Sequence, residues 1–189
     1  MSKVYIFLAD GFETIEGLTV VDVLRRAGIE ITTVSINSTR TVTTAHKISL
    51  TADLTFEEAD FSDAGMYVLP GGMPGTLNLQ AHEGLSKLLE EATAKQIKLA
   101  AICAAPSILG QKGLLQGKKA TCYPSFEEKL IGANVQDTTV VVDGDIITGR
   151  GMGAAIDFSL AIVKELTDEK TAQEVGEGIE YLQYFPQRF

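Results

Sequence analysis

Residues 98–106 read Lys-Leu-Ala-Ala-Ile-Cys-Ala-Ala-Pro, an apolar run that ends at Cys103 and passes directly into small residues and a proline. A short apolar run bounded by a turn is typical of an inner strand of a parallel sheet. Pro106 fits the first turn of a helix, where its missing N–H has no intrahelical partner to lose. We therefore predict a buried strand, a sharp elbow and a helix that begins at about Ala105.

Cys103 is the candidate nucleophile of this elbow. A thiol at a helix N-terminus meets free N–H groups and the positive end of the helix dipole, so we expect its pKa to fall below the free value of about 8.5. The small residues Ala101 and Ala105 flank it as glycines flank the serine of a G-x-S-x-G nucleophile elbow. The alternative is a buried structural cysteine, the usual state of a free cysteine.

Length and composition predict one domain that spans residues 1–189. Of the 189 residues, 45% are hydrophobic, which is enough for a core without disulfides or metals. Cys103 and Cys122 match neither a disulfide framework nor a metal-binding spacing, so we expect a reducing environment, such as the cytoplasm. The N-terminal apolar stretch is too short for a signal peptide, and no run approaches the roughly 18 apolar residues of a membrane span. A net charge of −9 argues against nucleic-acid and membrane partners.

The order of expected elements indicates a doubly wound fold. A strand over Val4–Leu8, a helix over about Glu13–Ala27 and a strand over Ile29–Ser35 form a βαβ unit, which predicts a parallel sheet. Further elements are expected, in chain order, as a hairpin at 40–42 and 48–51, a strand at 66–69, a helix around 85–92, a strand at 120–122, a short helix at 126–131, a hairpin around Asp143-Gly144, a helix at 154–166 and a short helix after Thr167 or Asp168. We predict a flavodoxin-like, mostly parallel sheet between two layers of helices. The aromatic tail over residues 181–186, Tyr-Leu-Gln-Tyr-Phe-Pro, is expected to dock on the protein.

Four inner strands end in residues suited to chemistry: Asp10-Gly11-Phe12-Glu13, Pro70-Gly71-Gly72, Cys103-Ala104 and Gly149-Arg150-Gly151. In a parallel sheet the carboxyl ends of such strands lie at one edge, where ligands bind. Residues far apart in the sequence are therefore expected to form one site.

Two carboxyl groups begin the first helix. Glu13 and Glu16 are three residues apart and can share one face. Glu16 has apolar neighbours, so a raised pKa would let it stay protonated, hydrogen-bond a thiolate or move protons. The alternative is a pair of ordinary first-turn acids that the helix dipole favours.

Gly71 and Gly72 could present a backbone N–H to an oxyanion, with the N–H of Ala104 as the second donor, although a plain strand-ending turn would look the same. Arg150 lies in a glycine-rich stretch that is a poor dinucleotide loop, and an arginine there is more often a structural ion-pair partner than a ligand. His46 and His82 are the only histidines, and we expect both to be solvated. A Cys-His-acid protease is therefore disfavoured. Cys122 is expected to be structural, with proximity to Cys103 left open.

Several of these motifs together closely resemble the DJ-1/ThiJ/PfpI superfamily, and most closely its branch of parkinsonism-associated protein deglycases and their bacterial relatives. The resemblance runs from Val4 to about Leu166. It is carried by residues 9–16 (ADGFETIE), 21–28 (VDVLRRAG), 69–72 (LPGG), 100–106 (AAICAAP) and 149–153 (GRGMG).

The resemblance implies roles for individual residues. Cys103 would be the nucleophile, Glu16 the protonated carboxyl that hydrogen-bonds it, and Gly72 and Ala104 the backbone donors. Glu13, Tyr123 and Arg150 would line the site. The family also implies a homodimer, with the first helix and the hairpin near His46 in or close to the interface. His46 stands where that branch often has an arginine, so the contact is expected to differ in detail.

Two positions depart from the family pattern. Ala104 stands where the peptidase branch has a histidine, which argues against proteolysis. Tyr123, followed by the matching Pro124, stands where the deglycase branch often has a histidine. Because tyrosine is a weaker base, Glu16 would have to move the protons.

The resemblance implies a cysteine-dependent, cofactor-free glyoxalase or deglycase that acts on small α-oxoaldehydes or on their protein adducts. The alternative is an oxidative-stress sensor or chaperone that works through oxidation of Cys103. Both hypotheses need the same residues, so the sequence leaves them open.

Overall fold

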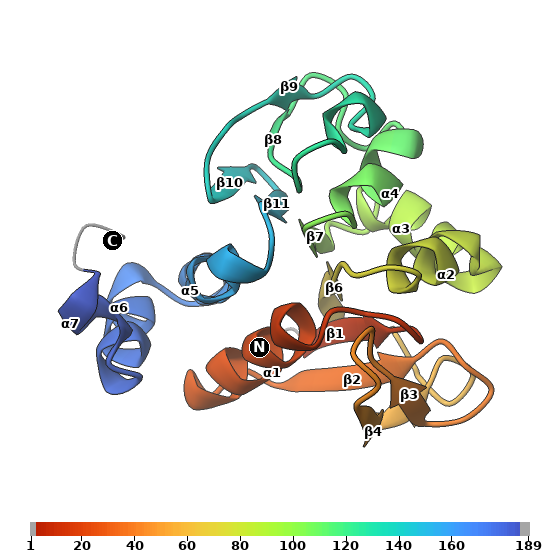
Figure 1. Cartoon of the computed structure of the whole chain (residues 1–189), viewed down its shortest axis with the longest axis horizontal. Helices are drawn as coiled ribbons and strands as arrows, with labels where there is room; N and C mark the ends of the chain where they lie inside the picture. Colours follow the sequence, from red (N-terminus) through yellow and green to blue (C-terminus); the bar gives the residue numbers. More distant parts are fainter. Residues whose placement is uncertain (1–2, 186–189) are drawn as a thin grey trace.

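A seven-stranded sheet forms the centre of the protein, which we describe from a computed structural model over residues 3–185. Across the sheet, the strands are ordered β10 (Val140–Asp143), β11 (Ile146–Gly149), β7 (Lys98–Ile102), β6 (Ala64–Leu69), β1 (Lys3–Leu8), β2 (Ile31–Ser35) and β5 (Leu54–Thr55). All neighbours are parallel except β10 and β11, which form an antiparallel pair. The predicted flavodoxin-like, mostly parallel sheet is confirmed (Figure 1).

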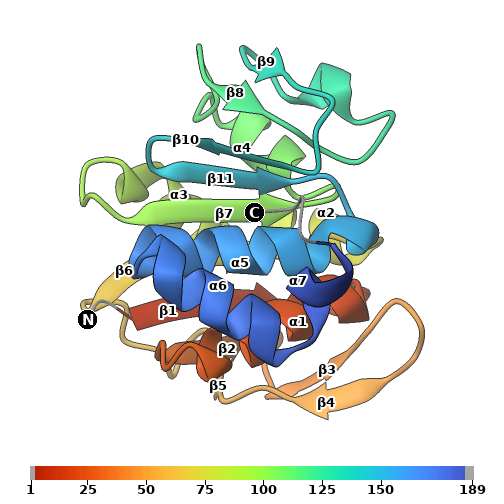
Figure 2. The same ribbon diagram turned by 90° about the vertical axis from the view of Figure 1, so that its left-hand side faces the viewer.

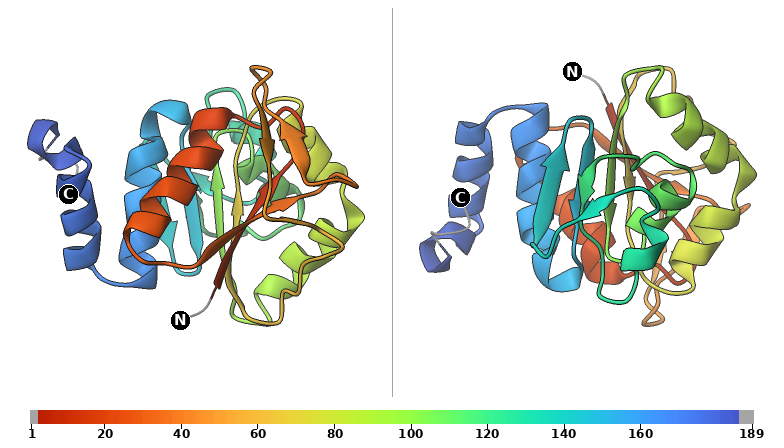
Figure 3. Two further views of the ribbon diagram at one scale, coloured as in Figure 1. Left: turned by 90° about the horizontal axis from the view of Figure 1, so that it is seen from below. Right: turned by 90° about the horizontal axis from the view of Figure 1, so that it is seen from above.

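Helices cover both faces of this sheet. One face carries α1 (Thr14–Arg26) and α5 (Ala155–Leu166), with α6 (Glu169–Gly178) outside them; α5 and α6 lie in front of the sheet in Figure 2. The other face carries α2 (Gly75–Ala81), α3 (Glu83–Ala92) and α4 (Pro106–Gln111). Figure 3 shows the two layers from opposite sides of the molecule.

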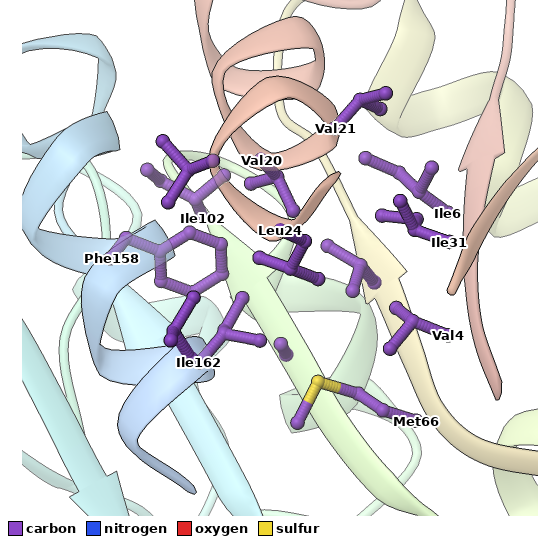
Figure 4. Packing of buried hydrophobic residues seen from close by; sticks show 14 of the residues in the cluster. Val4, Ile6, Val20, Val21, Leu24, Ile31, Met66, Ile102, Phe158 and Ile162 are labelled. Atoms are coloured by element: carbon purple, nitrogen blue, oxygen red, sulfur yellow. The ribbon is translucent and has the colours of Figure 1, made fainter. Parts of the chain in front are cut away.

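The alternation of side chains along β1 explains why the sheet needs helices on both faces. Val4, Ile6 and Leu8 belong to the core beneath α1 and α5, whereas Tyr5 and Phe7 belong to the core beneath the other helices. Successive strand residues point to opposite faces, so a strand that is apolar throughout must be buried on both sides. In Figure 4, Leu24 of α1 and Phe158 of α5 meet the strand residues of the first core.

Most expected elements are present within one or two residues. The early hairpin is β3 (Thr41–Thr43) with β4 (Ser49–Thr51), and Asp143-Gly144 joins β10 to β11. The remaining elements are β8 (Lys119–Ala120), η1 (Glu127–Lys129), β9 (Asn134–Val135), η2 (Met152–Ala154) and α7 (Tyr181–Tyr184). The predicted cap of the last short helix is Asp168, whose carboxylate accepts a hydrogen bond from the Thr171 N–H at 2.7 Å.

The chain beyond α6 folds back as predicted. The Tyr181 hydroxyl donates to Asp157 of α5 at 2.5 Å, which fixes α7 against the body of the protein. Pro186, the end of the predicted aromatic tail, lies outside the described residues. None of the helices in residues 3–185 combines the length and apolar character that crossing a bilayer requires.

Candidate active site

The sheet order brings the four predicted strand ends to one edge. β11, β7, β6 and β1 are consecutive neighbours and run parallel, so the segments that follow them leave the sheet side by side (Figure 2). The segments after β6 and β7 and the start of α1 contact the Cys103 side chain, and β11 contacts its backbone. The prediction of a shared edge is confirmed.

Cys103 occupies the predicted elbow after β7. Its φ angle is +66°, in the left-handed region that non-glycine residues seldom adopt. Its N–H donates to the Gly149 carbonyl at 2.9 Å, and its carbonyl accepts from the Tyr123 N–H at 2.8 Å. Pro106 follows as the first residue of α4. Two neighbouring segments therefore hold the strained backbone of the half-buried cysteine.

Glu16 is the carboxyl group beside this thiol. Its side chain reaches from α1 across to the elbow and is 1% exposed. One carboxyl oxygen, Oε2, accepts the Gly71 N–H at 2.9 Å, and the carboxyl group is hydrogen-bonded to Cys103. A Cβ atom on Gly71 would lie 2.6 Å from Cβ of Cys103 and 2.7 Å from Oε2 of Glu16. Only glycine lets these two side chains meet.

Two backbone N–H groups point at the sulfur of Cys103, those of Gly72 and Ala104. Gly72 has φ +89°, and a Cβ there would lie 2.3 Å from the backbone nitrogen of Glu13. Gly72 is therefore required both for its conformation and for the close approach of α1. The N–H groups of Gly72 and Ala104, the two donors that the resemblance implied, therefore lie beside the Cys103 thiol.

Burial raises the pKa of Glu16 to about 7, and the negative charge of Glu13 adds to the effect. This agrees with the predicted raised pKa. Burial also raises the pKa of Cys103 to about 12, reinforced by the charge of Glu16 and by the hydrogen bond to it. The expectation of a lowered thiol pKa is wrong, because burial and a nearby carboxylate outweigh the N–H groups at the start of α4. The thiol therefore needs a group that takes its proton, and Glu16 is in contact with it.

Glu13 lies at the rim of this pair. It caps α1, where its carboxylate accepts the Ile15 N–H at 3.5 Å, and its side chain is only 15% exposed. Nδ1 of His46 lies 3.6 Å from its other oxygen, Oε2. His46 itself is solvated, as predicted, with 74% of its side chain exposed. The hairpin therefore brings one exposed imidazole to the edge of the site.

Tyr123 contacts the elbow through its backbone, because its N–H donates to the Cys103 carbonyl, and Arg150 follows Gly149, whose carbonyl accepts the Cys103 N–H. Tyr123 is half-exposed, and its ring lies against Gly151. Arg150 forms the ion pair that the sequence left open, with Nη1 2.6 Å from Oδ1 of Asp137. Tyr123 and Arg150 therefore lie next to the backbone that holds Cys103, and their side chains lie outside the contact between Cys103 and Glu16.

The remaining histidine and cysteine stand apart from this chemistry. His82 is half-buried, which corrects the expectation that it is solvated: its Nδ1 accepts the Leu85 N–H at 3.0 Å and so caps α3. Its position before an apolar helix face was the available signal. Cys122 is 1% exposed and belongs to the core on the opposite face of the sheet from the one that Cys103 contacts. Both thiols are free.

Within residues 3–185, no three histidine, cysteine, aspartate or glutamate side chains gather in a way that could hold a metal ion. The contacts that sequence reasoning missed are backbone contacts, above all the Gly149 carbonyl that holds Cys103. The glycine-rich sequence after β11 indicated that this segment lies near the site, but it did not indicate that the Gly149 carbonyl accepts a hydrogen bond from Cys103.

A cysteine at a strand elbow, paired with a buried carboxyl group at the carboxyl edge of a doubly wound sheet, defines a class of α/β proteins built around one thiol. A protein-family model identifies which family of this class the chain belongs to. The chain belongs to the DJ-1/PfpI family, whose model matches residues 2–165.

Named relatives agree with this assignment. Protein dj-1beta of Drosophila melanogaster is 36% identical over 182 residues, which cover 95% of this chain and 97% of the fly protein. Protein DJ-1 homolog B of Arabidopsis thaliana is 39% identical over 176 residues, but this chain spans only 40% of the plant protein. A protein of Pyrococcus abyssi that is named a deglycase is 32% identical over 169 residues, which cover 87% of this chain and 99% of the archaeal one.

Solved structures show the same fold. A cysteine-to-alanine mutant of a DJ-1 superfamily protein from Salmonella typhimurium superposes with a TM-score of 0.91 at 33% identity, covering 96% of this chain and 99% of that one. Oxidized DJ-1 of Toxoplasma gondii gives a TM-score of 0.92 at 31% identity, with 96% and 99% covered.

Proposed function

We propose that this protein is a cofactor-free, cysteine-dependent enzyme that converts small α-oxoaldehydes, or their adducts with proteins, to 2-hydroxy acids. The observation that carries the proposal is the contact between the Cys103 thiol and the buried Glu16 carboxyl group. The similarity to an archaeal protein named a deglycase supports the same reaction class. Ala104 in place of a histidine after the nucleophile argues against a peptidase.

In the first step, the sulfur of Cys103 attacks the aldehyde carbon as Glu16 accepts the thiol proton. Glu16 is suited to this role because its pKa of about 7 leaves a substantial carboxylate fraction at neutral pH. The new S–C bond converts the carbonyl oxygen to an oxyanion, which takes the proton back from Glu16 to give a hemithioacetal and leaves Glu16 as a carboxylate. The N–H groups of Gly72 and Ala104 stabilise the negative charge that develops at the elbow.

The second step moves a proton between the two carbons of the substrate. Glu16 removes the C1 hydrogen, an ene-diol forms, and the proton returns to C2 to leave a thioester on Cys103. Water then hydrolyses the thioester, which releases the 2-hydroxy acid and restores the thiol. Overall, one α-oxoaldehyde and one water give one 2-hydroxy acid, and no external oxidant or reductant is needed.

The test is methylglyoxal consumption with lactate detection, under metal-free and thiol-free conditions, for the native protein and Cys103→Ser. We expect turnover to fall by at least about a thousandfold in the variant, as for the loss of a nucleophile. Cys122→Ser is the matched control and should retain native turnover, because Cys122 lies in the other core. Equal lactate formation by the native protein and Cys103→Ser would overturn the proposal.

We further propose a homodimer in a reducing compartment such as the cytoplasm. Members of the family are commonly dimers. Ile15 and Leu18 expose apolar side chains on α1, and Ile48 does so on the hairpin. The two free thiols are in keeping with a reducing environment. The molar mass in solution, measured by light scattering, distinguishes a dimer from a monomer.

A sensor that works through oxidation of Cys103 is the second candidate. The Glu16 carboxyl and the two N–H groups around the sulfur could hold the oxygens of a sulfinate, which favours this reading. The raised thiol pKa works against it, since the thiolate is the form that peroxide oxidises. Selective gain of two oxygens at Cys103, in a protein without lactate formation, would favour the sensor over the enzyme.

A further inference from the structure

A cavity of about 350 Å³ lies beside the elbow and has no role in the steps above. Its walls are mostly apolar and include Tyr123, Pro124, Met152 and Ala154, with Thr139 and Arg150 at its borders. Half of the Tyr123 side chain and more than half of the Met152 side chain are exposed, so the cavity opens to solvent.

The cavity is joined to the nucleophile through two backbone contacts. The N–H of Cys103 donates to Gly149 at 2.9 Å, and its carbonyl accepts from Tyr123 at 2.8 Å. The same two segments continue into the cavity: Tyr123 is one wall, and Gly151, two residues after Gly149, lies against its ring. The apolar space therefore begins at the residues that hold Cys103.

The charge around the cavity indicates what it can hold. Arg150 is the charged residue among its lining, and its guanidinium is already paired with Asp137 at 2.6 Å. This ion pair weakens the attraction of Arg150 for an anionic group, whereas the tyrosine, proline and methionine side chains favour an apolar one. An apolar cavity of about 150 Å³ is enough for a benzene ring, so this space is large enough for an aromatic substituent.

We propose that this cavity is the subsite for the substituent of the carbonyl substrate, and that it favours an uncharged aromatic group over a methyl group. The inference rests on the proposed function, because it names the kind of α-oxoaldehyde that Cys103 would receive. For phenylglyoxal, the aldehyde carbon lies at Cys103 and the phenyl ring lies between Tyr123 and Met152. The product is mandelate, formed with one water as in the methylglyoxal reaction.

The test fills the cavity from its border and compares two substrates. Thr139 is exposed and lines the cavity, so Thr139→Trp should place a large side chain over it without disturbing the core. We expect kcat/KM for phenylglyoxal to fall about tenfold, whereas that for methylglyoxal changes less than about twofold. The control is Thr138→Trp, because Thr138 is the neighbouring exposed residue and does not line the cavity.

Equal losses for both substrates, or no loss for either, would overturn the subsite. Met152→Ala is a second variant, which removes one wall instead of adding bulk, and it should lower kcat/KM for phenylglyoxal about threefold with methylglyoxal unchanged. Circular dichroism of each variant identifies any that fails to fold.

A labelling experiment separates this inference from the proposed function. Phenacyl bromide and iodoacetamide both alkylate thiols, and only the first carries a phenyl ring. Thr139→Trp should slow modification of Cys103 by phenacyl bromide alone, measured by peptide mass analysis. If neither aldehyde is turned over but this selective slowing occurs, the enzyme proposal fails and the subsite stands. If the slowing is absent, the subsite fails whatever the turnover.

Discussion

The surroundings of the two cysteines differ in one decisive way. Burial raises the pKa of both thiols, that of Cys103 to about 12 and that of Cys122 to about 11. Cys122 lies in an apolar core, whereas Cys103 contacts the Glu16 carboxyl and two backbone N–H groups. A thiol's own acidity therefore does not separate a candidate nucleophile from a structural cysteine. What separates them is a neighbouring group that can take the thiol proton, and Cys103 has one in Glu16.

The largest expected effect comes from making the surroundings of Cys103 resemble those of Cys122. Glu16→Gln keeps the shape of the side chain but cannot accept the thiol proton, so we expect turnover to fall by about 10² to 10⁴. Native turnover should rise as pH increases through about 7, because the carboxylate is the active form. Steady-state rates across this pH range check both statements, and a variant with native turnover would contradict the comparison.

The same variant has an expected effect on stability. A carboxyl group whose pKa is raised from 4.5 to about 7 on folding binds more protons in the native state than in the unfolded state between these values. The free energy of unfolding therefore falls as pH rises through this window, by on the order of 3 kcal/mol for this group. Urea unfolding at the two ends of the window should show this fall in the native protein and a smaller one in Glu16→Gln.

A smaller effect is expected from separating the two side chains without removing either. Gly71→Ala would place a Cβ 2.6 Å from Cys103 and 2.7 Å from Glu16, so one of them must move. We expect turnover to fall about a hundredfold, the effect of a misplacement of about 1 Å. Gly178→Ala is the matched control, because a Cβ there meets nothing within 4 Å. Equal rates for the two alanine variants would show that the close approach is unimportant.

The smallest expected effect concerns the rim. His46 faces Glu13, and the charge of Glu13 helps to raise the pKa of Glu16. His46→Ala removes the imidazole that lies 3.6 Å from the Glu13 carboxylate. The carboxylate then acts on Glu16 without this partner, so the rise of activity with pH should move upward by about a few tenths of a unit, limited by solvent screening. His46→Arg places a cation beside Glu13, so the pH at which activity rises should not move upward. A pH profile that is unchanged in His46→Ala would show that the hairpin has no electrostatic effect on Glu16.

The sheet and the meeting of its strand ends could be predicted because both follow from local patterns. The run before Cys103 and the βαβ order at the N-terminus specify a parallel sheet, and a parallel sheet has only one carboxyl edge. The strand β9 and its pairing with β8 were not predicted, since a strand of two residues carries no periodicity.

The pKa of Cys103 could not be predicted from the sequence, because it depends on depth and distance. The start of α4 was visible in Pro106, but the burial of the thiol and its contact with Glu16 come from packing between β7 and α1. His82 was misjudged for a similar reason, since its role as a helix cap depends on where α3 begins.

The positive φ angle of Cys103 bears on how this protein would respond to selection. A non-glycine residue held in that conformation costs about 1 kcal/mol or more, and glycine would adopt it without that cost. A screen for thermal tolerance alone would therefore reward the loss of the side chain on which the proposed chemistry depends. Directed evolution of this protein needs a selection for turnover alongside any selection for heat resistance.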